Sequence, residues 1–202
     1  MMKLFLLVIS YIFHPLFIPV AGTISYFAIT PKYTPIEEQS GNILPIFILT
    51  VIIPIITYLI LKNVGLIQSV FMPTLKERRY PLYISILLLL MVVYKVIPNN
   101  YTAELHYYFL GLIAATMASL LLLFLNFKSS MHLMGMGSIF MYLICLSVHF
   151  EINITLALSV LILLIGLVAT SRLYLKAHSK AELVIGFFIG LVSQLLTIKF
   201  WL

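Results

Sequence analysis

The segment TSRLYLKAHSKAELV, residues 170–184, packs five ionisable side chains into eleven positions between two long apolar stretches. They are Arg172, Lys176, His178, Lys180 and Glu182. If His178 stands in the first turn of the last helix, Glu182 lies one turn further along the same face. A carboxylate there accepts the imidazole N–H, fixes the tautomer and leaves the other ring nitrogen free to attack. The segment therefore predicts a histidine nucleophile with an orienting carboxylate.

Two other polar segments supply cations, hydroxyls and a second histidine. They are TLKERRYP, with Lys76, Arg78 and Arg79, and KSSMH, with Lys128, Ser129, Ser130 and His132. SSMH and HSKAE both have the composition of helix starts, where unpaired N–H groups and the helix dipole stabilise an oxyanion. Arginine adds a planar group that grips two phosphate oxygens. With His132 as proton donor, these residues predict phosphoryl transfer through a phosphohistidine, with no metal and no cofactor.

The composition of the whole chain is that of an integral membrane protein. Of its 202 residues 63% are hydrophobic and 9% are charged, and the mean hydropathy is +1.16, far from the range of soluble domains. Seven apolar segments occupy residues 4–29, 43–61, 82–97, 107–127, 133–148, 154–170 and 183–202. Because lipid-exposed segments must satisfy their own backbone hydrogen bonds, we expect an all-α polytopic transmembrane bundle of six to seven helices in a single domain, residues 1–202.

Counting the spans in order places the three polar segments on one face of the membrane. That face receives nine of the twelve basic residues: Lys3, Lys62, Lys76, Arg78, Arg79, Lys128, Arg172, Lys176 and Lys180. The positive-inside rule makes it the cytoplasmic face, with the N-terminus inside. The net charge of +6 is small and dispersed over loops, which is typical of contact with anionic lipid headgroups and argues against a nucleic-acid partner.

The polar segments resemble the signatures of a known family, the type 2 phosphatidic acid phosphatases. SRLYLKAHSKAE fits the third signature, S-R-x5-H-x3-D, with Glu182 where the family has Asp. SSMH is similar to the second, P-S-G-H, and keeps Ser130 and His132. The remaining two positions of SSMH carry Ser129 for Pro and Met131 for Gly.

The first signature of that family is a lysine followed after six residues by Arg-Pro, and KERRYP matches it only in part. Arg79 would be its arginine, although Tyr80 intervenes before Pro81. The position of the lysine falls on Met72. The likeness is strongest over residues 70–202 and includes the order of the motifs and their shared face.

The resemblance implies a helical membrane enzyme that removes phosphate from lipid phosphates or isoprenoid diphosphates without a metal. It implies that His178 is the nucleophile, that Glu182 orients it and that His132 protonates the leaving oxygen. The implied phosphate-binding residues are Arg172, Arg79 and Ser130, with Lys128 or Lys76 in place of the missing lysine. Bacterial relatives often work at the outer face of the inner membrane, whereas the charge count here favours the cytoplasmic face.

Other functions remain open at the level of the sequence. The altered first and second motifs fit a catalytically impaired relative that binds an anionic lipid phosphate, and a lipid phosphotransferase would share the same intermediate. A transporter is disfavoured because polar residues are scarce near the membrane midplane. His14, in the first apolar run, is expected to make a structural hydrogen bond at a helix break beside Pro15. Gly186 and Gly190 form a small-xxx-small pair, typical of helix packing.

Overall fold

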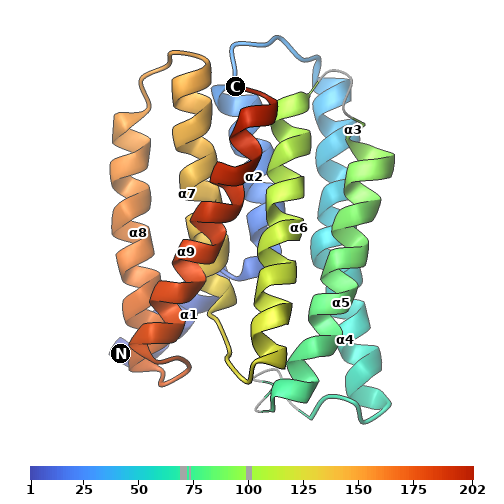
Figure 1. The fold of residues 1–202 in the computed structure, drawn as a ribbon, viewed down its shortest axis with the longest axis vertical. Coiled ribbons are helices and arrows are strands. Elements are labelled where there is room, and N and C mark those ends of the chain that lie inside the picture. The colour runs from blue at the N-terminus through green and yellow to red at the C-terminus, as the bar shows by residue number, and fades with distance from the viewer. Residues whose placement is uncertain (69–71, 73, 99–101) are drawn as a thin grey trace.

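The computed structural model describes residues 1–68, 72, 74–98 and 102–202. These residues form seven helical spans that are long and apolar enough to cross a membrane, which confirms the expected all-α polytopic bundle (Figure 1). The elements are α1 (Met2–Ile12), η1 (Pro15–Phe17), α2 (Ile18–Ile29), α3 (Ile36–Phe47), η2 (Ile48–Ile52), α4 (Ile53–Asn63), α5 (Leu75–Met91), η3 (Val92–Val96), α6 (Ala103–Phe124), α7 (Met131–His149), α8 (Thr155–Tyr174), α9 (Lys180–Thr197) and η4 (Ile198–Phe200).

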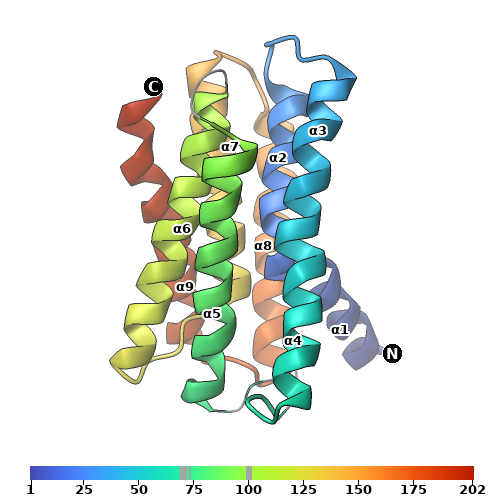
Figure 2. The same cartoon turned by 90° about the vertical axis from the view of Figure 1, so that its right-hand side faces the viewer.

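The first span is broken where the sequence places His14 and Pro15. Proline lacks a backbone N–H and disfavours a helical conformation in the residue before it, and α1 accordingly ends at Ile12. The chain resumes in the short helix η1, whose N-cap is His14. Figure 2 shows α1 leaning away from the axis of α2, so that the N-terminal helix points outward at its own end of the bundle.

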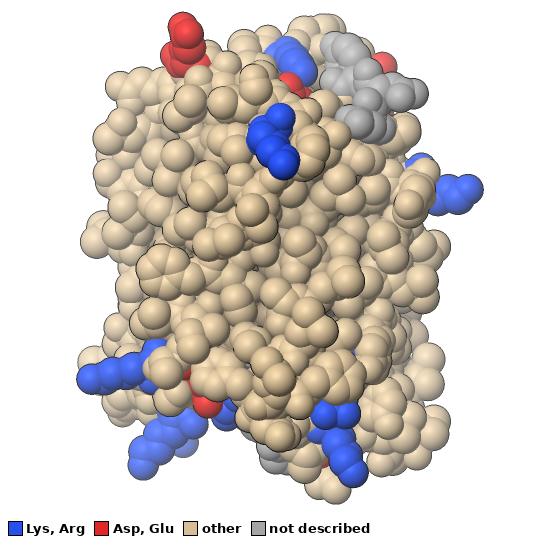
Figure 3. Space-filling model, viewed as in Figure 1, with Lys and Arg blue, Asp and Glu red and all other residues tan. Residues whose placement is uncertain are grey.

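The two ends of the bundle differ in charge as the parity of the spans predicts. The N-terminus and the connections α4–α5, α6–α7 and α8–α9 lie at one end, and the C-terminus lies at the other (Figure 1). Most of the lysine and arginine side chains visible in Figure 3 gather at the N-terminal end. We call this end the basic face. The three polar segments therefore meet there, although the spans begin or end several residues away from the predicted limits.

Helices α7 and α9 pack against each other through glycine. A Cβ atom built on Gly186 would lie 2.6 Å from the carbonyl oxygen of Ser130, and one on Gly190 would overlap that of Met134. The helices approach so closely that a methyl group has no room at either position. This confirms the packing role expected for the pair, and it places the start of α9 directly beside the start of α7.

At the opposite end of the bundle a buried carboxylate joins three helices. Glu104 at the start of α6 is 3% exposed, and its Oε1 lies 2.6 Å from Nζ of Lys32 and 3.4 Å from Nε2 of His149. The hydroxyl of Tyr26 donates to its Oε2 over 3.2 Å. A buried charge requires such partners, so this cluster fixes the non-basic end of α2, α6 and α7.

Candidate functional site

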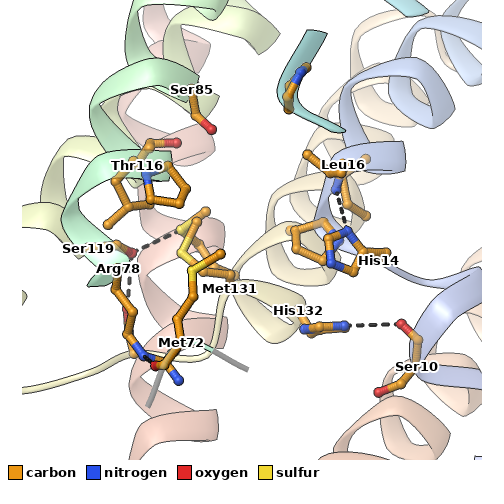
Figure 4. A pocket seen from close by; sticks show the side chains of 18 of the residues that line it. Ser10, His14, Leu16, Met72, Arg78, Ser85, Thr116, Ser119, Met131 and His132 are labelled. Carbon is orange, nitrogen blue, oxygen red and sulfur yellow. Dashed lines mark hydrogen bonds between the residues drawn. The ribbon is translucent and has the colours of Figure 1, made fainter. Parts of the chain in front are cut away.

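A cavity of about 770 Å³ opens among the helices at the basic face. Figure 4 shows Arg78 on one wall and His14 and His132 on the opposite wall. The polar side chains that line it are Lys3, Ser10, Tyr11, His14, Thr50, Arg78, Ser85, Thr116, Ser119, Lys128, Ser129, His132, Arg172 and Lys176. Towards the membrane interior most of the lining is apolar, with the hydroxyl side chains of Thr50, Ser85 and Thr116 among it. On α6 it runs from Leu123 to Leu112, a depth of about 16 Å at 1.5 Å per residue.

The imidazole of His178 is bound to the carboxylate of Glu182, as the spacing predicted. Nδ1 of His178 lies 2.6 Å from Oε2 of Glu182. Because an ionised carboxylate only accepts, Nδ1 carries the hydrogen and Nε2 keeps its lone pair. Among the described residues Nε2 has no hydrogen-bond partner. The contact is confirmed; the catalytic role assigned to it stays a prediction.

His178 precedes α9 instead of standing in its first turn, which corrects the expected position. The N-cap of α9 is Ser179, whose hydroxyl accepts from the backbone N–H of Glu182. Glu182 is the third helical residue and reaches back to the N–H of Ser179 over 3.3 Å, which completes a capping box. The same oxygen, Oε2, also accepts the hydrogen bond from Nδ1 of His178. The extra methylene of Glu182 relative to Asp gives it this reach.

Burial keeps the ring of His178 neutral. Its side chain is 4% exposed, and burial, which penalises the charged form, is the largest cause that lowers its pKa from 6.5 to about 4. The hydrogen bond to Glu182 raises the pKa, while the nearby cations of Arg172 and Arg78 lower it further. At neutral pH the imidazole therefore has the unprotonated nitrogen that a nucleophile needs.

Ser10 of α1 contacts two of the predicted site residues, Arg172 and His132. Its hydroxyl accepts from Nη1 of Arg172 over 2.6 Å, and its carbonyl oxygen lies 3.1 Å from Nε2 of His132. A carbonyl only accepts, so Nε2 of His132 carries a hydrogen and Nδ1 is left for a ligand. The hydroxyl of Ser171 donates to the carbonyl of Leu6 over 2.7 Å, which fastens α8 to α1 beside this contact.

Lys128 lines the cavity and lies next to the contact between His178 and Glu182. Its Nζ is 3.7 Å from Oε2 of Glu182 and donates to the carbonyl of Ala177 over 3.3 Å. Lys76, the other lysine considered, is exposed in the first turn of α5 and does not line the cavity. Of the two lysines, Lys128 therefore has the position that a phosphate-binding cation requires.

Ser130, expected at the phosphate, does not line the cavity. It is fully buried, and its hydroxyl has no hydrogen-bond partner among the described residues. Its backbone N–H donates to the carbonyl of Glu182 over 3.0 Å. Ser129 lines the cavity in its place and donates to the hydroxyl of Ser119 over 3.0 Å. The backbone of Ser130 packs against Gly186 of α9, and this contact between α7 and α9 buries the residue.

Arg79 also lies away from the cavity, and Arg78 takes its place. The guanidinium of Arg79 sits 4.4 Å from the ring centroid of Phe124, a cation–π contact, and it is absent from the cavity lining. Arg78 lines the cavity, and its Nε donates to the carbonyl of Met72 over 3.0 Å. Both arginines are helical because α5 begins at Leu75, seven residues before the predicted limit.

The structure thus divides the predicted residues into two groups. His132, Arg172 and Lys128 line one cavity, whereas His178 and Glu182 do not line it, although Ala177, the residue before His178, does. Arg79, Ser130 and Lys76 lie elsewhere, as described above. The cavity also includes Ser10 and His14, from a part of the chain that carries no motif.

Comparison of the chain with protein-family models, with curated proteins and with solved structures gives no match. The likeness to the type 2 phosphatidic acid phosphatases therefore stays a prediction, carried by the motif residues themselves.

Proposed function

We propose that the chain is a membrane-embedded phosphatase that hydrolyses lipid phosphates or isoprenoid diphosphates through a phosphohistidine on His178. The observation that carries the proposal is the 2.6 Å contact between Nδ1 of His178 and Oε2 of Glu182, with Nε2 unpartnered among the described residues. This is the arrangement of an activated histidine: a carboxylate sets the tautomer, and the opposite nitrogen holds the lone pair.

In the first step Nε2 of His178 bonds to phosphorus while the P–O bond to the lipid breaks. The substrate enters with one P–OH proton, and the neutral imidazole of His132 accepts this proton at Nδ1 and passes it to the departing oxygen, while its Nε2–H stays on the carbonyl of Ser10. Arg172, Arg78 and Lys128 balance the charge of the transferring phosphoryl group. Glu182 stabilises the positive charge that forms on the imidazole of His178.

In the second step a water molecule attacks the phosphohistidine. The P–N bond breaks, its electron pair returns to Nε2 of His178, and Nδ1 of His132 takes the proton of the water. The phosphate product takes this proton back from Nδ1 of His132 and leaves through the basic face. If a lipid hydroxyl attacks in place of water, the same residues perform a phosphotransfer, and the assay described below separates the two reactions by their products.

The shape of the cavity supports a lipid substrate. Cations and hydroxyls line its mouth, whereas Leu112, Leu88 and Leu89 lie deep in its wall. A phosphate with an apolar chain presents the same order of groups, and ligand pockets are typically apolar with a few placed polar groups. Burial of the chain along this wall holds the phosphate at the mouth.

A second candidate is a binding protein that retains an anionic lipid phosphate without turnover. It is favoured by one observation: His178 does not line the cavity and is 4% exposed, whereas Arg172 and Lys128 do line it. This candidate predicts that lipid phosphate binds equally well when His178 is replaced.

Substitution of His178 by asparagine tests the proposal. Asparagine keeps an N–H near the position of Nδ1, so the contact with Glu182 and the fold survive, but it has no counterpart of Nε2. Purified protein is incubated with phosphatidic acid, phosphatidylglycerol phosphate and polyprenyl diphosphates. We expect the parent to release phosphate from at least one substrate and His178→Asn to release none, with an unchanged Tm. Phosphate appearing on an added lipid alcohol instead would indicate phosphotransfer, and turnover by His178→Asn would refute the proposal.

A further inference from the structure

His14 lies in the cavity although it belongs to none of the motifs. It occupies the break between α1 and η1 and lines the same wall as His132, with ring centroids 5.4 Å apart. The two rings meet edge to face at 80°. A histidine in a membrane segment is costly unless it has a polar partner or faces a polar space. His14 has both, because it accepts a hydrogen bond from the backbone N–H of Leu16 and lines the cavity.

The contacts of His14 define its tautomer. The backbone N–H of Leu16 donates to Nδ1 over 3.3 Å. An amide N–H only donates, so Nδ1 holds a lone pair and the hydrogen of the neutral ring lies on Nε2. Among the described residues Nε2 has no hydrogen-bond partner, and in Figure 4 it points away from Leu16 into the cavity.

From this geometry we infer that His14 is a phosphate-binding residue, donating Nε2–H to an oxygen of the phosphate held between Arg78 and His132. The inference rests on the proposed function for the nature of the ligand. Arg78 and His14 line opposite walls of the cavity (Figure 4), and Arg172 also lines it, so the donor of His14 and these cations face one shared space. A neutral donor adds a hydrogen bond without adding a further positive charge beside Arg172 and Arg78.

Two substitutions of His14 separate this role from that of a helix cap. His14→Asn places an oxygen near the position of Nδ1 and keeps the bond from the N–H of Leu16, since asparagine is a good N-cap, but it removes the distant donor. His14→Gln extends an N–H towards the position of Nε2 and loses the cap. A donor role predicts a functional defect in His14→Asn at unchanged Tm, and function near the parent level in His14→Gln at lowered Tm. A purely structural role predicts the reverse order.

Binding is measured in a His178→Asn background, which has no nucleophile. The ligand is short-chain phosphatidic acid in detergent micelles, with the matching diacylglycerol as the control that lacks phosphate. We expect His14→Asn to weaken binding of phosphatidic acid by about tenfold to a hundredfold, the range for a hydrogen bond to a charged group, with no change for diacylglycerol. Equal binding by His14→Asn and its parent would overturn the inference, and so would an equal loss in His14→Gln.

Phosphate release by the parent protein, measured in parallel, decides the proposed function separately. Absence of turnover together with binding that depends on His14 would refute the phosphatase and support the donor. Turnover together with binding that is independent of His14 would support the phosphatase and refute the donor.

Discussion

The neutral state of His178 has consequences for how the protein responds to pH. The pKa of this group is about 4 in the folded chain, against 6.5 when it is unburied. Above the higher value both states are unprotonated, and the group does not affect stability. Between the two values only the unfolded chain binds the proton. The free energy of unfolding therefore decreases as the pH falls through this window.

The expected result is a neutral His178 at every pH above about 4. The ¹⁵N resonances of the histidine side chains in detergent micelles report the charge of each ring, and His178→Asn identifies the signal of interest by its loss. Thermal unfolding of the two proteins, compared from neutral to acidic pH, gives the linked effect: the parent loses more stability than the variant. A ring that titrates near 6.5 would contradict the buried, neutral nucleophile.

At the residue scale, the sequence predicts contacts between near neighbours more directly than it predicts which face of a helix meets the cavity. The contact of His178 with Glu182 follows from four residues of chain, so the sequence alone predicts it. The choice between Arg78 and Arg79 depends on which face of α5 meets the cavity. Arg78 lies in register with Pro81, Leu82 and Ser85, which also line it, and this helical repeat is a signal that was present in the sequence. No spacing or motif in the sequence indicates that Ser10 contacts Arg172 and His132.

At the scale of elements, the contact between α7 and α9 positions His178 and Glu182. Gly190 has no room for a methyl group, whereas nothing lies within 4 Å of a Cβ built on Gly166 in α8. We expect Gly190→Ala to destabilise the protein by about 1–3 kcal/mol through overpacking. Gly166→Ala is the matched control and is expected to stabilise by about 0.5–1 kcal/mol, the helix preference for alanine. Thermal unfolding measures both.

The same contact links stability to the site. The carbonyl of Glu182 accepts from the backbone N–H of Ser130, so a shift of α9 away from α7 also moves Glu182 and His178. We therefore expect phosphate release to fall in Gly190→Ala and to persist in Gly166→Ala. An active and fully stable Gly190→Ala would contradict the close packing.

Element limits were predicted less well than element types. The apolar segment 82–97 predicts a helix that begins after KERRYP, yet α5 begins at Leu75 because Thr74 caps it. The hydroxyl of Thr74 accepts from the N–H of Glu77 and donates to the carboxylate of Glu77 over 2.8 Å. A Thr-x-x-Glu pattern is the sequence signal for such a start. The break at His14 was expected from Pro15, but its place in the cavity depends on the tilt of α1, which no local pattern encodes.

At the scale of the whole molecule, the seven spans place Lys180 and Glu151 at opposite ends of the bundle. Both positions are exposed. In oriented membrane vesicles a thiol reagent that does not cross the bilayer is expected to label Lys180→Cys and Lys76→Cys from the same side, and Glu151→Cys from the other. The native Cys145 is 2% exposed and serves as the unlabelled control. Labelling of all three from one side would contradict the arrangement, and the side that labels Lys180→Cys identifies the compartment of the site.

The central claim is that a phosphoryl group is carried by His178, and a trapped intermediate tests it most directly. The protein is mixed briefly with ³²P-labelled lipid phosphate and denatured in alkali, in which phosphohistidine survives, and the labelled peptide is located by mass spectrometry. We predict label on the peptide that contains His178, lost on acid treatment and absent from His178→Asn. Phosphate release without any label, or label that persists in His178→Asn, would contradict the account.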